Sequence, residues 1–244
     1  MVKLITLAGM DLIDHLSLFS PIDGAAVAFL VFLAVAIGWL IDHKGIARPS
    51  VSVLMMEYRR EWMRAFVVRD PRIYDMMTLD GLRNGITFYA SACIVAIGSG
   101  LALVGNTAPL QGLASDLTLE AASALVLKVK ILLALAFVIN AFLKFVWSHR
   151  LFGYCAIMMA AVPVDPAHPE CYDRAGQAAE LIITAARAYN RGLRSVYFAL
   201  GALGWMFGPV ALILSALATA AVLLRREFAS QSREIMLRRA PPKT

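Results

Sequence analysis

Hydrophobic and polar positions are arranged along the chain in long blocks. Four blocks are almost entirely apolar, and they cover about residues 22–41, 85–104, 131–147 and 197–224. A helix needs about 20 apolar residues to cross the hydrocarbon core of a bilayer. The sequence therefore predicts an all-α, polytopic membrane protein with four transmembrane helices.

Helical patterning also extends beyond the apolar blocks. After the third block only Gly153 interrupts the pattern before Pro163, and the prolines of VPVDPAHPE then end one helix and start another. The residues that follow lead into the fourth block without a break. We therefore expect residues 148–196 to form two antiparallel helices that project into the cytoplasm.

The first loop predicts a further helix, over about residues 51–68. Its apolar face holds Met55, Tyr58, Trp62 and Phe66, and its polar face holds Glu57, Arg60, Glu61 and Arg64. Such an amphipathic pattern is typical of a helix that lies on a surface. Two placements fit it: the inner face of the membrane, or the cytoplasmic helix pair.

The fourth apolar block contains Gly208-Pro209, which interrupts regular helical geometry. A hairpin of two spans would need about 40 residues. The block over residues 197–224 is shorter than that. We therefore expect one kinked helix rather than a hairpin.

Lys and Arg set the expected orientation, because they are enriched in the cytoplasmic loops of membrane proteins. The first loop holds eight of them and the third loop six, whereas the second loop holds only Lys128 and Lys130. This distribution predicts that the first and third loops lie inside. With four spans, both the N-terminus and the C-terminus then lie outside. Six further Lys and Arg in the C-terminal tail conflict with that placement.

Composition narrows the class of protein further. The chain has 244 residues, of which 60% are hydrophobic and 16% charged, and its mean hydropathy is +0.70. Soluble proteins carry about 25% charged residues. The net charge of +6 comes from basic residues between the apolar blocks. We therefore expect the lipid bilayer as a partner, and no nucleic acid.

The sequence contains no motif that predicts catalysis or a cofactor. Cys93, Cys155 and Cys171 lack metal-binding spacing, so we expect free thiols. No phosphate-binding loop, nucleophile elbow or zinc-protease motif occurs. His43 and His149 fall on the same predicted side, but each lies at a helix end beside a charged residue. We therefore expect no enzyme, no haem and no metal site.

Polar residues gather at the predicted cytoplasmic ends of the four spans. They are Asp42, His43, Arg83, Asn84, Lys144, His149, Arg150, Asn190, Arg191 and Arg194. One interpretation is anchoring, in which long basic side chains reach lipid headgroups. The other is a vestibule that attracts anions, as rings of basic residues do in anion pores. Arg191 and Arg194 share a helix face, and we expect them to bind phosphate headgroups or Asp42.

One face of the third span is polar inside the predicted membrane region. Asn140, Lys144 and Ser148 recur four residues apart, which puts them on one side of the helix. Hydrogen bonds to neighbouring helices or a conduction path would explain this face. Small residues that allow close helix packing, within one subunit or in a homo-oligomer, also recur on the second and fourth spans. They are Ala92, Ala96, Gly100, Gly204 and Gly208.

Several longer segments resemble those of a known family. In chain order they are EYRREWMRAF, DGLRNGITFYASACIVAIGSGLALVG, KILLALAFVINAFLKFVWSHRLFGYC and RGLRSVYF…WMFGP. From about Asp42 to Leu224 the chain resembles the membrane proteins catalogued as domain of unknown function 599, found in proteobacteria and plants. The resemblance implies a membrane fold, and we expect the inner membrane of a bacterium. It implies no activity, cofactor or site residue.

Two functional hypotheses follow from these residues. The polar face of the third span and the basic span ends favour an oligomeric pore or transport protein for small ions, anions in particular. The alternative is a non-catalytic membrane scaffold or accessory subunit that binds a partner through its cytoplasmic helices. The sequence leaves both hypotheses open.

Overall fold

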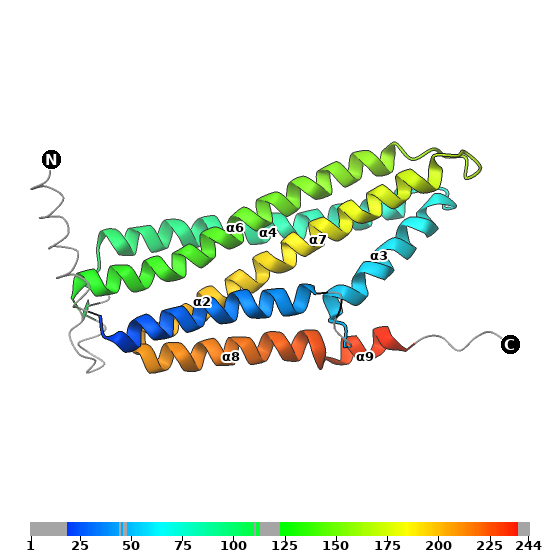
Figure 1. Ribbon diagram of the computed structural model, residues 1–244. Helices are drawn as coiled ribbons and strands as arrows, with labels where there is room; N and C mark the ends of the chain where they lie inside the picture. Colours follow the sequence, from blue (N-terminus) through cyan, green and yellow to red (C-terminus); the bar gives the residue numbers. More distant parts are fainter. Residues whose placement is uncertain (1–18, 44, 46–47, 110, 113–122, 239–244) are drawn as a thin grey trace, which may run out of the picture.

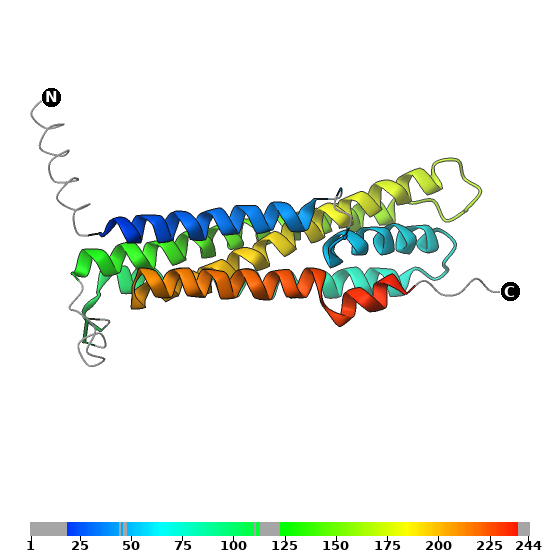
Figure 2. The same cartoon turned by 60° about the horizontal axis from the view of Figure 1, so that its bottom comes forward.

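The computed structural model describes residues 19–43, 45, 48–109, 111–112 and 123–238, and every regular element within these ranges is helical. In chain order the elements are α2 (Pro21–Asp42), α3 (Val51–Val67), α4 (Ile73–Gly105), α6 (Ala124–Ala160), α7 (Cys171–Ala202), the short 3-10 helix η1 (Leu203–Phe207), α8 (Pro209–Phe228) and α9 (Gln231–Leu237). The five longest helices run along a common direction, and α3 and α9 lie toward one end of the bundle (Figure 1, Figure 2).

Four helical segments are long and apolar enough to cross a membrane. They are α2, α4, α6 and the segment Pro209–Leu237, which contains α8 and α9. The predicted all-α membrane fold with four apolar spans is therefore confirmed. Helices α4 and α6 have 33 and 37 residues, so each is longer than the roughly 20 residues that a bilayer core requires. The final turns of α6 pack antiparallel to the first half of α7, as predicted for the helix pair beyond the third span (Figure 1).

Serine side chains begin four of the helices. Ser20, Ser50, Ser123 and Ser230 each accept a hydrogen bond from the backbone N–H three residues later. Such caps satisfy backbone donors that have no partner within the helix. The Ser50 hydroxyl also donates to the carbonyl oxygen of Ile41 at 2.7 Å, which ties the start of α3 to the end of α2.

The fourth apolar block is a helical hairpin. Helix α7 ends at Ala202, η1 follows, and α8 then runs back antiparallel to α7 (Figure 1). The turn uses Gly208, whose φ of 105° is a conformation that glycine adopts without strain. Pro209 follows at the first helical position, where its missing N–H costs no hydrogen bond. The predicted single kinked helix is therefore wrong.

The error arose because α7 enters the bundle before the apolar block begins. The helix is continuous from Cys171, and its buried polar residues Arg194 and Ser195 bind neighbouring helices, where they are tolerated inside a membrane protein. The hydropathy of the sequence therefore places the start of this membrane-crossing segment too far along the chain. On the return, the Ser215 hydroxyl donates to the Gly201 carbonyl oxygen at 2.6 Å. A Cβ added at Gly204 would lie 2.9 Å from the carbonyl oxygen of Ala211. These small residues thus serve packing within the subunit.

The hairpin returns the chain to the end of the bundle where α3 lies. The Tyr58 hydroxyl donates to the Met236 carbonyl oxygen at 3.1 Å, and Arg233 Nε donates to the Pro49 carbonyl oxygen at 3.0 Å. The start of α2 and the end of α9 lie at opposite ends of the bundle (Figure 1). The described residues thus begin and end at opposite ends of the bundle, whereas the sequence predicted that both ends of the chain lie on one side.

This arrangement also removes the conflict over the basic tail. The basic residues of α8 and α9 lie at the same end as those of α3 (Figure 1). Among the described Lys and Arg residues, only Lys128 and Lys130 belong to the other end, on the first turns of α6. We call the end with α3 and α9 the basic end, and the end with η1 the opposite end.

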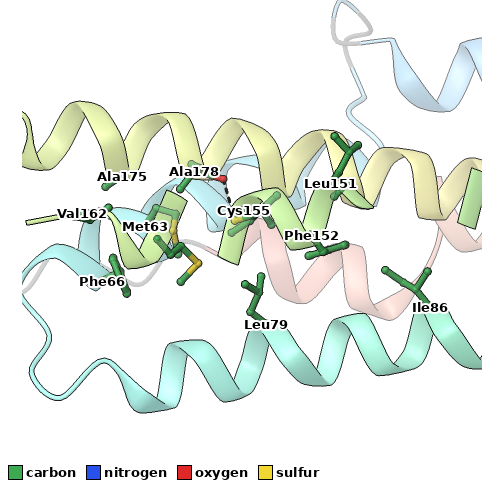
Figure 3. Close-up of a cluster of buried hydrophobic side chains, with 14 of the residues drawn as sticks. Met63, Phe66, Leu79, Ile86, Leu151, Phe152, Cys155, Val162, Ala175 and Ala178 are labelled. Atoms are coloured by element: carbon green, nitrogen blue, oxygen red, sulfur yellow. Dashed lines mark hydrogen bonds between the residues drawn. The ribbon is translucent and has the colours of Figure 1, made fainter. Parts of the chain in front are cut away.

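Two apolar cores fill the bundle. The first joins α3, α4, α6 and α7, and Figure 3 shows Met63, Phe66 and Leu79 in it. The Cys155 thiol in this core donates to the Ala178 carbonyl oxygen at 3.5 Å. The second core joins α2, α7, η1 and α8. Met63, Phe66 and Val67 of α3 are buried in the first core, so this helix packs against the helix pair. Tyr58, which the sequence placed on the apolar face, is 44% exposed.

Candidate functional site

A groove lies between α2 and α6, and α7 forms its floor. Its cavity measures about 570 Å³. Its apolar wall consists of Val31, Ala34, Val35, Phe137 and Phe198. Its polar wall consists of Asp42, His43, Asn140, Lys144, Arg191, Arg194 and Ser195. On each of the three helices the charged residues lie nearer the basic end than the apolar ones, so the groove is charged at one end and apolar along the rest.

The groove opens on the side of the bundle. The rim residues Val31, Val35 and Trp39 on α2 are 44%, 67% and 63% exposed. Across the groove on α6, Leu143 is 61% exposed. Exposed apolar side chains of this kind face lipid in a membrane protein. The cavity therefore faces the surrounding bilayer instead of running along the bundle axis, which the two cores fill.

A single carboxylate joins two arginines at the charged end. Arg191 Nε donates to Asp42 Oδ2 at 2.7 Å, and Arg194 Nη2 lies 3.0 Å from both carboxylate oxygens. The Arg194 side chain is only 8% exposed and that of Asp42 13%, whereas that of Arg191 is 50% exposed. The expected contact of the two arginines with Asp42 is thus present. Helices α2 and α7 are joined through it.

Positive charge exceeds negative charge in this part of the groove. Lys144 is half-buried across from Asp42 and forms no hydrogen bond or ion pair with any described residue. Arg194 Nη1 is buried and likewise has no partner among the described residues. Asp42 is the one carboxylate in the wall, against three cationic side chains. Lys144 therefore keeps its donors available to the groove, whereas Arg194 Nη1 is enclosed by protein.

Further cations lie behind Asp42, where α3 crosses α7. Arg59 and Arg187 line a small cavity that also touches Asp42. Arg187 Nε is buried without a partner in the described part of the chain. Burial lowers the pKa of the Arg59 guanidinium. Glu227 accepts hydrogen bonds from Ser52 in the wall of this cavity. Asp42 and Glu227 together still offset only a fraction of the positive charge here, which makes the region attractive to anions.

This chemistry suits a phosphate or another oxyanion. Cationic groups without partners are costly in apolar surroundings, and an oxyanion in the groove would satisfy them through charge-assisted hydrogen bonds. Arginine offers a planar fork of donors, and lysine adds a mobile ammonium group. Arg191, Arg194 and Lys144 supply both kinds of donor around one cavity.

The polar face of α6 divides between two roles. Asn140 Nδ2 donates to Ser195 Oγ at 2.9 Å, and the Ser195 hydroxyl donates to the Phe137 carbonyl oxygen at 2.7 Å. The fully buried Ser148 hydroxyl donates to the Ala185 carbonyl oxygen at 2.7 Å. These are hydrogen bonds between α6 and α7, one of the two predicted explanations. Lys144, between them on the same face, points to the groove instead.

Six of the candidate residues lie away from the groove, and they are Arg83, Asn84, Ser148, His149, Arg150 and Asn190. Ser148 is buried under α7, and His149 is half-buried one residue later. Arg83 and Asn84 lie on α4, where Asn84 Nδ2 donates to Asp80 Oδ2 at 3.2 Å. His43 is part of the groove wall and stacks on Trp39, with ring centroids 4.7 Å apart. In the part of the chain that the structure describes, no cluster of His, Cys, Asp or Glu could hold a metal.

Several wall residues could not be found from the sequence. Trp39, Ser195 and Gly38 line the cavity, yet none belongs to a polar cluster in the sequence. Trp39 has a usable signal, since tryptophan is enriched at membrane interfaces. Gly38 and Ser195 have none, because their role depends on which faces of α2 and α7 flank the groove.

A second polar cluster serves the joint between α3 and α4. Asp75 is fully buried, accepts a hydrogen bond from Trp62 Nε1 at 2.6 Å and forms an ion pair with Arg69. Arg72 donates to the carbonyl oxygens of Val162 and Pro163, at 2.8 and 2.7 Å. These contacts fasten the α3–α4 turn to the tip of the α6–α7 pair. They line no cavity, so they indicate a structural role.

Comparison with known proteins gives a family and no closer relative. No curated protein and no solved structure matches the chain. The family described as "Protein of unknown function, DUF599" matches residues 25–232, which include the groove and the α7–α8 hairpin. The match supports the expected resemblance over nearly the whole chain. The chain is a member of the DUF599 family.

Proposed function

We propose that this membrane protein binds an anionic group at the charged end of the groove. The observation that carries the proposal is the excess of cationic side chains: Lys144, Arg191 and Arg194 share one cavity with one carboxylate, that of Asp42. The role is binding rather than catalysis. The anion would bind the ammonium group of Lys144, which no described residue uses, and the half-exposed guanidinium of Arg191.

We further propose that the basic end faces the cytoplasm, in the inner membrane of a bacterium. The enrichment of Lys and Arg on α3, α8 and α9 supports this orientation. The start of α2 would then lie outside, and α9 inside. The anion site lies at the level of the last residue of α2, and thus near the inner membrane surface.

Anion binding is compatible with both functional hypotheses from the sequence. An oligomeric pore or transporter would need a path beyond the groove, because apolar cores fill the bundle axis of one subunit. Transport of anions therefore stays a prediction, to be tested by flux into liposomes. A scaffold role also stays a prediction, and the exposed faces of the cytoplasmic helix pair are the surface it would use.

A soluble anion tests the proposal. The full chain, purified in an uncharged detergent, is titrated with glycerol 3-phosphate while thermal unfolding is followed, with glycerol and an equal ionic strength of KCl as references. We expect stabilisation by the phosphate compound alone. Lys144→Gln should weaken this binding about tenfold, because one charge-assisted hydrogen bond is lost.

Lys128→Gln is the matched control. It makes the same substitution on the same helix at the opposite end, away from the groove. This variant should respond as the unmodified protein does. An identical response of both variants, or no response of the unmodified protein, would exclude the proposed anion site.

A further inference from the structure

We propose that the ligand of the groove is an anionic phospholipid of the inner leaflet, with its phosphate at the charged end and an acyl chain along the apolar wall. The inference rests on the proposed anion site and names the class of its ligand. The acyl chain would occupy the apolar part of the groove, which a small anion would leave empty.

The shape of the groove supports an amphiphile. A cavity of about 570 Å³ is within the roughly 300–1,000 Å³ of small-molecule sites. Only its charged end offers donors to an anion. The rest is lined by Val31, Val35, Phe137 and Phe198, side chains that an acyl chain would cover. An apolar wall that leads from a cationic cluster matches a molecule with an anionic head and a hydrocarbon tail.

The direction of opening supports a ligand from the bilayer. The α2 rim of the groove is exposed at Val35 and Trp39, by 67% and 63%. A lipid can enter from the side without crossing the protein. Trp39 also stacks on His43 at the charged end, and tryptophan is the side chain that membrane proteins place at headgroup level. The phosphate and tail of a lipid would therefore meet the cations and the apolar wall at suitable depths.

The buried donors specify an anionic headgroup. Arg194 is 8% exposed at its side chain and has one buried nitrogen without a partner among the described residues. Lys144 adds a cation that forms no ion pair with a described residue. A zwitterionic headgroup would bring its own cation to a region that already has an excess of positive charge. The site should therefore prefer phosphatidylglycerol to phosphatidylcholine.

Gly38 offers a way to block the apolar part alone. It lines the groove, and a Cβ added there would meet no atom within 4 Å. In Gly38→Leu the side chain would lean toward the start of α2, away from Asp42, as helical side chains do. It should fill the space for the tail and leave the charged end open. Gly24→Leu, on the same helix outside the groove and also without a neighbour within 4 Å, is the matched control.

The experiment measures lipid retention by native mass spectrometry of the full chain in an uncharged detergent. Phosphatidylglycerol and phosphatidylcholine with identical acyl chains are added in separate titrations. We expect one retained phosphatidylglycerol, bound about tenfold more tightly than phosphatidylcholine. Gly38→Leu and Lys144→Gln should each weaken this retention about tenfold, whereas Gly24→Leu and Lys128→Gln should not.

The titration with glycerol 3-phosphate shows whether a failure concerns the lipid inference alone or the anion site as well. Glycerol 3-phosphate should still stabilise Gly38→Leu, because the charged end is intact. If glycerol 3-phosphate binds but lipid retention is equal for the two lipids or unaffected by Gly38→Leu, the anion site stands and the lipid inference is wrong. If neither ligand binds, both are wrong. If Gly38→Leu instead abolishes a dimer, a second copy of the chain occupies the groove and the inference is also wrong.

Discussion

At the scale of single residues, Asp42 is the centre of the contacts between α2 and α7. Its carboxylate accepts hydrogen bonds from Arg191 and Arg194, and both Asp42 and Arg194 are largely buried. Taking charges out of water is costly, so the buried pair is tolerated only because each charge has its counter-charge. Loss of one partner leaves the other charge buried and unpaired.

Asp42→Asn should therefore destabilise the fold and strengthen anion binding. The buried Arg194 loses its counter-charge, and breaking a buried pair costs about 3 kcal/mol or more. The same change removes the one negative charge in the groove wall. We expect a lower free energy of unfolding in detergent mixtures, together with tighter binding of glycerol 3-phosphate.

Asp173→Asn is a suitable control for that measurement. Asp173 is exposed in the first turn of α7 and lies outside the groove. Exposed substitutions of this kind change stability by about 0.5 kcal/mol or less. If Asp42→Asn were as stable as Asp173→Asn, the contact would not join α2 to α7 in the way the distances indicate.

At the scale of the elements, the α7–α8 hairpin decides where the last third of the chain lies. Its turn depends on Gly208, whose φ of 105° is unfavourable for any residue with a Cβ. With ψ at 171° this is a backbone region that is essentially confined to glycine, and alanine there costs about 1–3 kcal/mol. We expect Gly208→Ala to lower the free energy of unfolding by this amount. Because a Cβ at Gly208 meets no atom within 4 Å, the effect would come from the backbone alone.

Gly105→Ala provides the comparison. Gly105 ends α4, has no positive φ and would also accept a Cβ without contact. Its replacement should change the free energy of unfolding by no more than about 0.5 kcal/mol. Equal effects at positions 105 and 208 would argue against the turn and in favour of the continuous kinked helix.

The sequence predicts most helices but not this hairpin, for a physical reason. Helices α2, α3, α4 and α6 follow from periodicity, caps and apolar length, all of which are local properties. The path of α7 does not, because Arg194 lies inside the bundle through its contact with Asp42 on another helix. A hydropathy profile cannot predict that a polar residue is buried when the residue that pairs with it is distant in the sequence.

The sequence predicted part of the candidate groove, namely which charged residues lie near one another. Asp42, Lys144, Arg191 and Arg194 were expected near one another, because each lies at the same predicted end of its helix. The sequence could not show that Ser148 turns toward α7 while Lys144 turns to the groove. That division depends on how α6 is rotated about its own axis, which packing decides.

At the scale of the whole molecule, the hairpin predicts that α9 and the end of α4 lie on opposite sides of the membrane. We expect Gly105→Cys to react with an impermeant thiol reagent added outside intact cells, and Ser232→Cys to react only after permeabilisation. Both positions are exposed. The background replaces the three buried native cysteines, Cys93, Cys155 and Cys171, by alanine.

A different labelling pattern would identify the alternative topology. A single kinked helix in place of the hairpin would put position 232 outside together with position 105, so that both react in intact cells. Protection of position 105 with labelling of position 232 would mean that the basic end faces outward, against the distribution of Lys and Arg.

The groove and its lipid ligand can be tested together by photochemical cross-linking in a bilayer. The full chain is placed in nanodiscs that contain phosphatidylglycerol with a photoreactive group in one acyl chain, and the labelled peptides are mapped. We predict that labels concentrate on the apolar wall, at Val31, Val35, Phe137 and Phe198, and fall strongly in Gly38→Leu but not in Gly24→Leu. Labels spread evenly over the exposed apolar faces of α4 and α8, and equal in both variants, would contradict a lipid site in the groove.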